Sequence, residues 1–371
     1  MREKIYGLDF EINSSTIVNN EKVINLIPNP DSTTIYEKSL EVLDEDSLKL
    51  LWSKNFFGIN HNTQMFQVMY DTFVDKLIDV KNIDDTLTVH ALFCDLIIRF
   101  GAIIEDFAGF CSSCYRHVLE STSLAEHFVA FGYPKEFYIK MLSDQSEAYL
   151  QPGFEATQTK DEVDMRIRQI FRIPQTKEEL DTIFIDLTDT EKELIWKGIS
   201  STTSILSDRM EWIAENIVSK HPSNFTLFDT YNKLKHGFAP FYSYLYPSPL
   251  DLATTDIQSS DEAIVESFIK DSMLIMHNKL PVQMTEVEKL RSKNQKLGTI
   301  TTTRIEVTKE KADQILNTVK AIDYLYKNLV KRYLAYSQGI NRIQFLGSSE
   351  YLTTEESDAI ISILDDDSRY A

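Results

Sequence analysis

The chain has 371 residues, and its 38 basic and 57 acidic side chains give a formal charge of −19 at pH 7. Hydrophobic residues make up 43% and charged residues 26%, which excludes a disordered, low-complexity or collagen-like chain. No stretch approaches the roughly 18 to 20 consecutive apolar residues that a membrane span needs, and the N-terminus leads into no apolar signal segment. We therefore expect a cytoplasmic protein without membrane contact.

The first 40 residues differ from the rest and predict an N-terminal arm with short strands. Residues 5–12 and 23–27 are rich in β-branched side chains, and Asn19 and Asn20 lie between them as a turn signal. Only eleven glycines and ten prolines interrupt the whole chain, so the remainder favours long helices. The predicted fold is an all-α, multi-helix bundle with a short β-hairpin or extended N-terminal arm.

Residues 41–280 are expected to form the helical core. Between residues 86 and 120, apolar side chains recur every three or four positions and the opposite face is barely polar, which predicts a central helix. Thr190 followed by Glu193 resembles a capping box at the start of a helix that runs to about residue 219. Shorter elements are predicted over residues 222–237, ending at Gly237, and over residues 261–279, as an amphipathic helix. Residues 297–308 are β-branched and indicate a strand or an extended linker.

Residues 281–371 are predicted to hold a basic segment and a long C-terminal helix that packs on the core. From residue 312 to 336 apolar and tyrosine side chains alternate at three and four, which suits a helix in a bundle or a coiled-coil dimer. Residues 281–335 carry eleven basic and six acidic side chains. This local positive excess favours contact with nucleic acid, with the acidic remainder of the chain, or with a protein partner or second copy.

Three cysteines lie in the central helical segment: Cys94, Cys111 and Cys114. The CxxC pair has no second CxxC to complete a zinc site, and His90 and His117 are the nearest further ligands. We therefore interpret the three cysteines as small buried side chains that permit close contact between helices. The sequence also lacks HExxH, GxxxxGK[ST], GxGxxG and GxSxG motifs, so we expect no metal and no cofactor.

Charged side chains on the central helix give one candidate site. Glu105 and Asp106 interrupt an otherwise apolar pattern, and buried charges must be paired or face a cavity. With Arg209 they would form the site of an enzyme of another helical class.

The segment 231–237 gives the candidate site with the clearest chemistry. Asn232 and His236 are four residues apart and share a helix face, so the amide can orient the imidazole as a general acid or base. Lys233 or Lys235 supplies a cation for a charged phosphate. Alternatively, His236 only caps the helix end.

The residues YNKLKHGF, 231–238, resemble the histidine motif of HEPN domains, in which R-N-x-x-x-H lies at a helix end. His236 matches the motif histidine and Asn232 the polar residue, whereas Tyr231 stands where the active families have arginine. A lysine or Arg209 would have to replace that cation. The resemblance implies an all-α bundle, often dimeric, common in prokaryotic antiviral and stress systems and frequently a metal-independent ribonuclease.

The sequence thus leaves two main functional hypotheses. In the first, a HEPN-like protein binds RNA or a nucleotide and cleaves RNA with His236, Asn232 and Lys235, while Tyr231, Lys233 and Arg209 contact the substrate. In the second, the same bundle is catalytically silent and recruits a partner or forms a homodimer through the C-terminal helix. The enzyme hypothesis predicts an open cleft at His236 with a basic group nearby.

Overall fold

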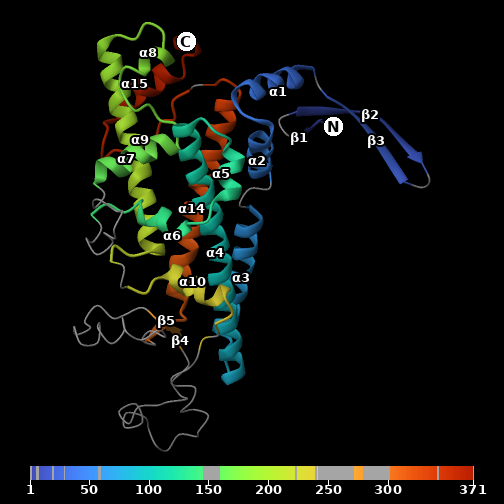
Figure 1. The fold of residues 1–371 in the computed structure, drawn as a ribbon, viewed down its shortest axis with the longest axis vertical. Helices are drawn as coiled ribbons and strands as arrows, with labels where there is room; N and C mark the ends of the chain where they lie inside the picture. The colour runs from blue at the N-terminus through green and yellow to red at the C-terminus, as the bar shows by residue number, and fades with distance from the viewer. Residues whose placement is uncertain are drawn as a thin grey trace, which may run out of the picture.

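The computed structural model describes residues 2–5, 8–18, 21–28, 30–56, 60–144, 159–221, 224–238, 240, 271–278, 301–340 and 342–370, with the backbone alone before residue 34. Helices dominate these residues, and the predicted all-α fold is confirmed (Figure 1). In chain order the helices are α1 (Pro30–Val42), α2 (Glu45–Phe56), α3 (Asn60–Ile78), α4 (Ile83–Glu120), α5 (Leu124–Ala130), α6 (Pro134–Ile139), α7 (Lys160–Ile170), α8 (Leu180–Ile183), α9 (Asp189–Ile217), α10 (Leu227–Lys235), α14 (Lys309–Ser337) and α15 (Thr354–Leu364), followed by the short 3-10 turn η3 (Asp367–Arg369).

Helix α4 is the centre of the bundle, as its apolar periodicity predicts. It spans 38 residues and packs against α3, α5, α6, α7, α10 and α14. Its N-cap Asn82 accepts the Asp85 backbone N–H, which fixes the start of the helix. By length and composition alone α4 is apolar enough to cross a membrane, but the same is true of core helices in soluble proteins, and half of its most apolar window is buried within this bundle.

Helix α14 lies beside α4 and contacts α2, α3 and α9 as well (Figure 1). The apolar stripe predicted from residue 312 onward faces the core: Ala312, Ile315, Val319, Ile322, Tyr326, Leu329 and Tyr333 are all buried. The stripe is therefore occupied by packing within the chain, as expected for a helix in a bundle.

The N-terminal arm is a three-stranded antiparallel sheet in the order β1 (Arg2–Ile5), β2 (Leu8–Val18) and β3 (Glu21–Pro28). Strands β2 and β3 pair from Val18 with Glu21 to Phe10 with Pro28, with a register shift between Ile12 and Ser14. This agrees with the expected strands and adds β1. The predicted turn at positions 19 and 20 lies outside the described residues.

A second sheet corrects the helix predicted over residues 261–279. Residues 272–277 form strand β4 (Ser272–His277), which pairs antiparallel with β5 (Thr301–Glu306), while residues 261–270 lie outside the described chain. Met273 and Ile275 are buried at alternate positions of β4, so burial follows the two-residue period of a strand and not the period of a helix. The partner strand lies within the β-branched segment that indicated a strand or linker.

Candidate functional site

Helix α10 carries the histidine segment and begins at a capping box. The Thr226 hydroxyl accepts the Asp229 backbone N–H, and the Asp229 carboxylate accepts the Thr226 N–H at 3.0 Å. His236 follows the last helical residue, and Gly237 has φ +79°, the left-handed conformation that suits a glycine after a helix. The predicted end of this helix at Gly237 is therefore confirmed.

Tyr231, the first residue of the histidine segment, is a core residue. Its side chain is only 3% exposed and packs on α4 where Gly101 leaves room for the ring. Burial raises the pKa of the Tyr231 phenol. The ring of Phe228 meets Tyr231 edge to face at a centroid distance of 6.0 Å. The buried Tyr231 ring thus packs α10 against α4.

The structure brings together Lys235 and Glu105, which the sequence assigned to two different sites. The Lys235 Nζ lies 2.8 and 3.0 Å from the two Glu105 carboxylate oxygens, and this hydrogen-bonded pair raises the pKa of Lys235. Asp106 is likewise paired, with Lys54 at 2.5 Å. Glu105 and Asp106, the two carboxylates of the predicted site on the central helix, are therefore each paired with a lysine.

The C-terminal end of the histidine segment lies at the surface, whereas Leu234 is buried in the core. His236 is exposed, and its backbone N–H donates to the Asn232 carbonyl at 3.2 Å. The Lys233 Nζ lies 4.9 Å from the centroid of the Phe238 ring. Arg209 is exposed on α9, and within the described residues no hydrogen bond or ion pair joins it to α10. Residues 235–238 thus form an exposed surface, next to the half-buried Asn232 and Lys233.

The cysteine pair is buried in the bundle. Cys111 and Cys114 are free thiols without solvent exposure, and burial raises the pKa of both. In the described part of the chain, no three His, Cys, Asp or Glu side chains converge as a metal site would require.

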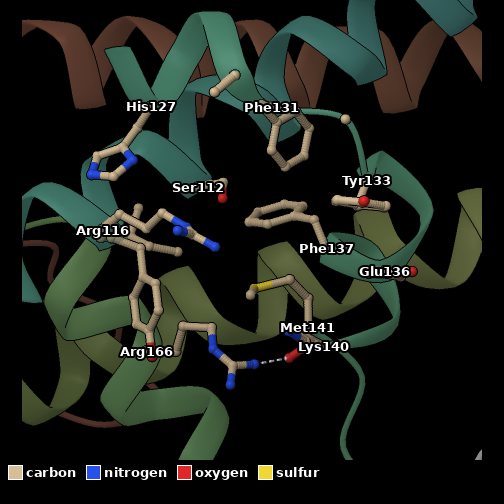
Figure 2. Close-up of a pocket in the computed structure, with 14 residues that line it drawn as sticks. Ser112, Arg116, His127, Phe131, Tyr133, Glu136, Phe137, Lys140, Met141 and Arg166 are labelled. Atoms are coloured by element: carbon tan, nitrogen blue, oxygen red, sulfur yellow. Dashed lines mark hydrogen bonds between the residues drawn. The ribbon is translucent and has the colours of Figure 1, made fainter. Parts of the chain in front are cut away.

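A hollow lies between α4, α5, α6 and α7. We name it the cationic–aromatic cavity; its volume is about 290 Å³, near the lower end for small-molecule sites. Figure 2 shows Arg116 and His127 on one side and the rings of Phe131, Tyr133 and Phe137 on the other. Its lining consists of Ser112, Tyr115, Arg116, His127, Ala130, Phe131, Gly132, Tyr133, Glu136, Phe137, Lys140, Met141, Arg166 and Ile170.

Positive charge dominates this cavity. Arg116, Lys140 and Arg166 line it together with a single carboxylate, Glu136. The nearest acidic partner of Arg116 is Glu120, at 3.8 Å, which is too long for a direct hydrogen bond.

Arg166 is fixed in place by the chain around it. Its Nη1 donates to the Lys140 carbonyl at 2.7 Å, the dashed line in Figure 2, and its guanidinium lies 5.7 Å from the Tyr115 ring centroid. These contacts restrict the conformations of the Arg166 side chain in the cavity wall.

Sequence reasoning missed this cavity. Arg116, Lys140 and Arg166 are scattered over 51 positions and three segments of the chain, so no local spacing connects them. Tyr133, which precedes Pro134 at the start of α6, is 69% exposed, and this exposure follows from the fold and cannot be seen in the sequence.

Comparison of the chain with protein-family models, with curated proteins and with solved structures finds no match.

Proposed function

We propose that the protein binds a nucleotide in the cationic–aromatic cavity. The observation that carries the proposal is the convergence of three cationic side chains and several aromatic rings on one hollow, in a chain whose net charge is −19. A nucleotide combines the two matching groups, since arginine pairs with phosphate oxygens and aromatic rings stack on bases.

The charge distribution supports an anionic ligand. At long range the acidic surface repels polyanions, so a nucleotide needs a local positive potential to enter. The cavity supplies it, because its cations outnumber its one carboxylate. The ligand is either a free mononucleotide or the terminal nucleotide of a single-stranded RNA, and both present the same chemistry.

Isothermal titration calorimetry tests the proposal with mononucleotides, the matching nucleosides and a short single-stranded RNA at constant ionic strength. We expect nucleotides to bind and nucleosides to bind much more weakly. Arg116→Ala should reduce nucleotide affinity by roughly 10-fold or more, because a hydrogen bond to a charged group contributes about 1.5 to 3 kcal/mol.

Arg209→Ala is the matched control, because it removes an exposed arginine outside the cavity. We expect its affinity to equal that of the parent. Equal loss in both variants would show a nonspecific charge effect and contradict the proposal. RNA that binds more tightly than its mononucleotides would identify the strand as the source of the ligand.

The HEPN-like ribonuclease is a second candidate, favoured by the exposure of His236 at the end of α10. The cation of that mechanism would have to come from Lys233, since Lys235 is held by Glu105. An RNA degradation assay in EDTA tests it: cleavage by the parent that disappears in a folded His236→Ala variant would support it. Absence of both cleavage and nucleotide binding would favour the catalytically silent interaction protein.

A further inference from the structure

A second cavity lies on the other side of α7, beside the C-terminal part of α14. Its volume is about 200 Å³, smaller than the cationic–aromatic cavity. Three arginines line it, Arg168, Arg172 and Arg332, and we name it the arginine cavity. Glu179 is its one carboxylate lining residue.

The surrounding chain holds each arginine of this cavity in place. The Arg332 Nη2 donates to the Arg172 carbonyl at 3.0 Å, and its Nη1 donates to the carbonyl of Arg342. The Arg168 Nη1 donates to the Pro174 carbonyl at 3.2 Å. The carbonyls orient the guanidinium groups but carry only partial charge, so they leave the positive charge of the cluster largely uncompensated.

Aromatic rings complete this support. The guanidinium of Arg172 lies 3.4 Å from the centroid of the Tyr336 ring, and that of Arg168 lies 4.7 Å from the Trp196 centroid. Stacking on rings leaves the edges of a guanidinium, which carry its N–H donors, open to a planar or tetrahedral oxyanion.

Burial has the largest effect on Arg168 and lowers its pKa, although two carboxylates, Asp164 and Glu179, lie near enough to favour its charged form. None of the cavity's three arginines forms an ion pair within the described residues, and the Glu179 carboxylate accepts the Gln175 backbone N–H at 3.2 Å. The Arg332 Nε is shielded from solvent and has no hydrogen-bond partner in the same part of the chain. Burial and the neighbouring Arg172 lower the pKa of Arg332 to about 10, which reflects the same unfavourable surroundings.

Arg172 follows the C-terminal end of helix α7. Its φ is +50°, in the left-handed region that asparagine and glycine adopt more readily. This conformation belongs to the Schellman motif that ends α7, in which the Ile173 N–H donates to the Arg168 carbonyl at 2.8 Å and the Arg172 N–H donates to the Gln169 carbonyl at 3.3 Å. The turn fixes the point from which the Arg172 side chain reaches the cavity.

We propose that the arginine cavity binds a small phosphate-class oxyanion, inorganic phosphate or pyrophosphate, between the guanidinium groups of Arg168, Arg172 and Arg332. The tetrahedral oxyanion accepts hydrogen bonds from two or three guanidinium edges at once, which is the geometry that arginine provides and a single lysine does not. The small volume selects a compact anion over a complete nucleotide. This site is separate from the proposed nucleotide site, because Arg166 of α7 lines the other cavity.

Calorimetric titration of the full chain with inorganic phosphate and with pyrophosphate, at constant ionic strength in sodium chloride, tests the proposal. We expect saturable binding of one anion per chain. Arg172→Asn should reduce that affinity at least 10-fold, since asparagine tolerates the left-handed backbone but lacks the guanidinium. Arg209→Asn, which removes an exposed arginine, should leave the affinity unchanged.

Two further results separate this site from the nucleotide site and from a purely structural role. Anion binding that survives Arg172→Asn and disappears in Arg116→Ala would place the anion in the cationic–aromatic cavity and overturn the proposal. No saturable binding by the folded parent would show that the arginines only hold α7 and α14 together, which also overturns it. If thermal unfolding shows that Arg172→Asn is not folded, Arg168→Gln provides the same comparison.

Discussion

Replacing Gly101 with alanine should destabilise the junction between α4 and α10 through a single steric overlap. A methyl carbon at position 101 would fall on the Cγ, Cδ2 and Cε2 atoms of Tyr231. The ring has little room to move, because it is 3% exposed and lies against Phe228. Overpacking of this kind lowers the free energy of unfolding by about 3 kcal/mol at the upper end of its usual range. The higher helix propensity of alanine over glycine raises it by about 1 kcal/mol. The net loss should be about 2 kcal/mol.

Urea denaturation followed by circular dichroism measures this loss, and a double-mutant cycle assigns it to the ring. In a Tyr231→Ala background the overlap is gone, so Gly101→Ala should stabilise the protein by about 1 kcal/mol instead. Gly109→Ala is the matched control on the same helix. Its methyl would lie 3.2 Å from the Phe131 Cδ1, so the steric and helix-propensity effects should nearly cancel. An identical loss from Gly101→Ala with and without Tyr231 would refute the reasoning.

Two further predictions concern titratable groups. Burial opposes ionisation of Glu211, but hydrogen bonds from Ser143 and Lys220 outweigh it and lower the pKa of Glu211 below its ordinary 4.5. A lowered carboxyl pKa stabilises the folded state above pH 4.5, and this stabilisation is lost as the pH falls through the lowered value. Glu211→Gln should therefore flatten the decline in melting temperature below pH 4.5, and an unchanged decline would contradict this. The Cys111 and Cys114 thiols should resist iodoacetamide at pH 8 until the chain is unfolded, because burial raises their pKa and excludes the reagent. Mass spectrometry after native labelling measures this, and rapid modification of either thiol would contradict their burial.

The long helices could be predicted because their information is local. The apolar period between residues 86 and 120 corresponds to α4, and the stripe from residue 312 corresponds to the buried face of α14. Local patterns also fix some ends, as Gly237 does for α10. They can mislead by a residue or two: the capping box of α9 is formed by Thr188 and Glu191, two positions before the similar pair at Thr190 and Glu193.

The elements that could not be predicted depend on distant parts of the chain. The apolar residues of β4 fit a helical spacing equally well, and only the pairing of Met273 with Ile305 in β5 selects the strand. The burial of Tyr231 depends on Gly101, 130 residues earlier, and a motif comparison cannot reveal this contact. The same holds for both cavities, because each is assembled from several elements.

The central position of α4 has a consequence for how the protein opens. Six other helices pack against its 38 residues, so α4 cannot fray in the middle without releasing their contacts as well. Its backbone amides near Phe100 and Phe107, both fully buried, should therefore exchange hydrogen only through global unfolding. The peripheral helix α15, which packs on α9 and the 3-10 turn after it, can detach at lower free energy. The bundle should thus show a graded pattern of hydrogen exchange, slowest along its axis and fastest at its edges.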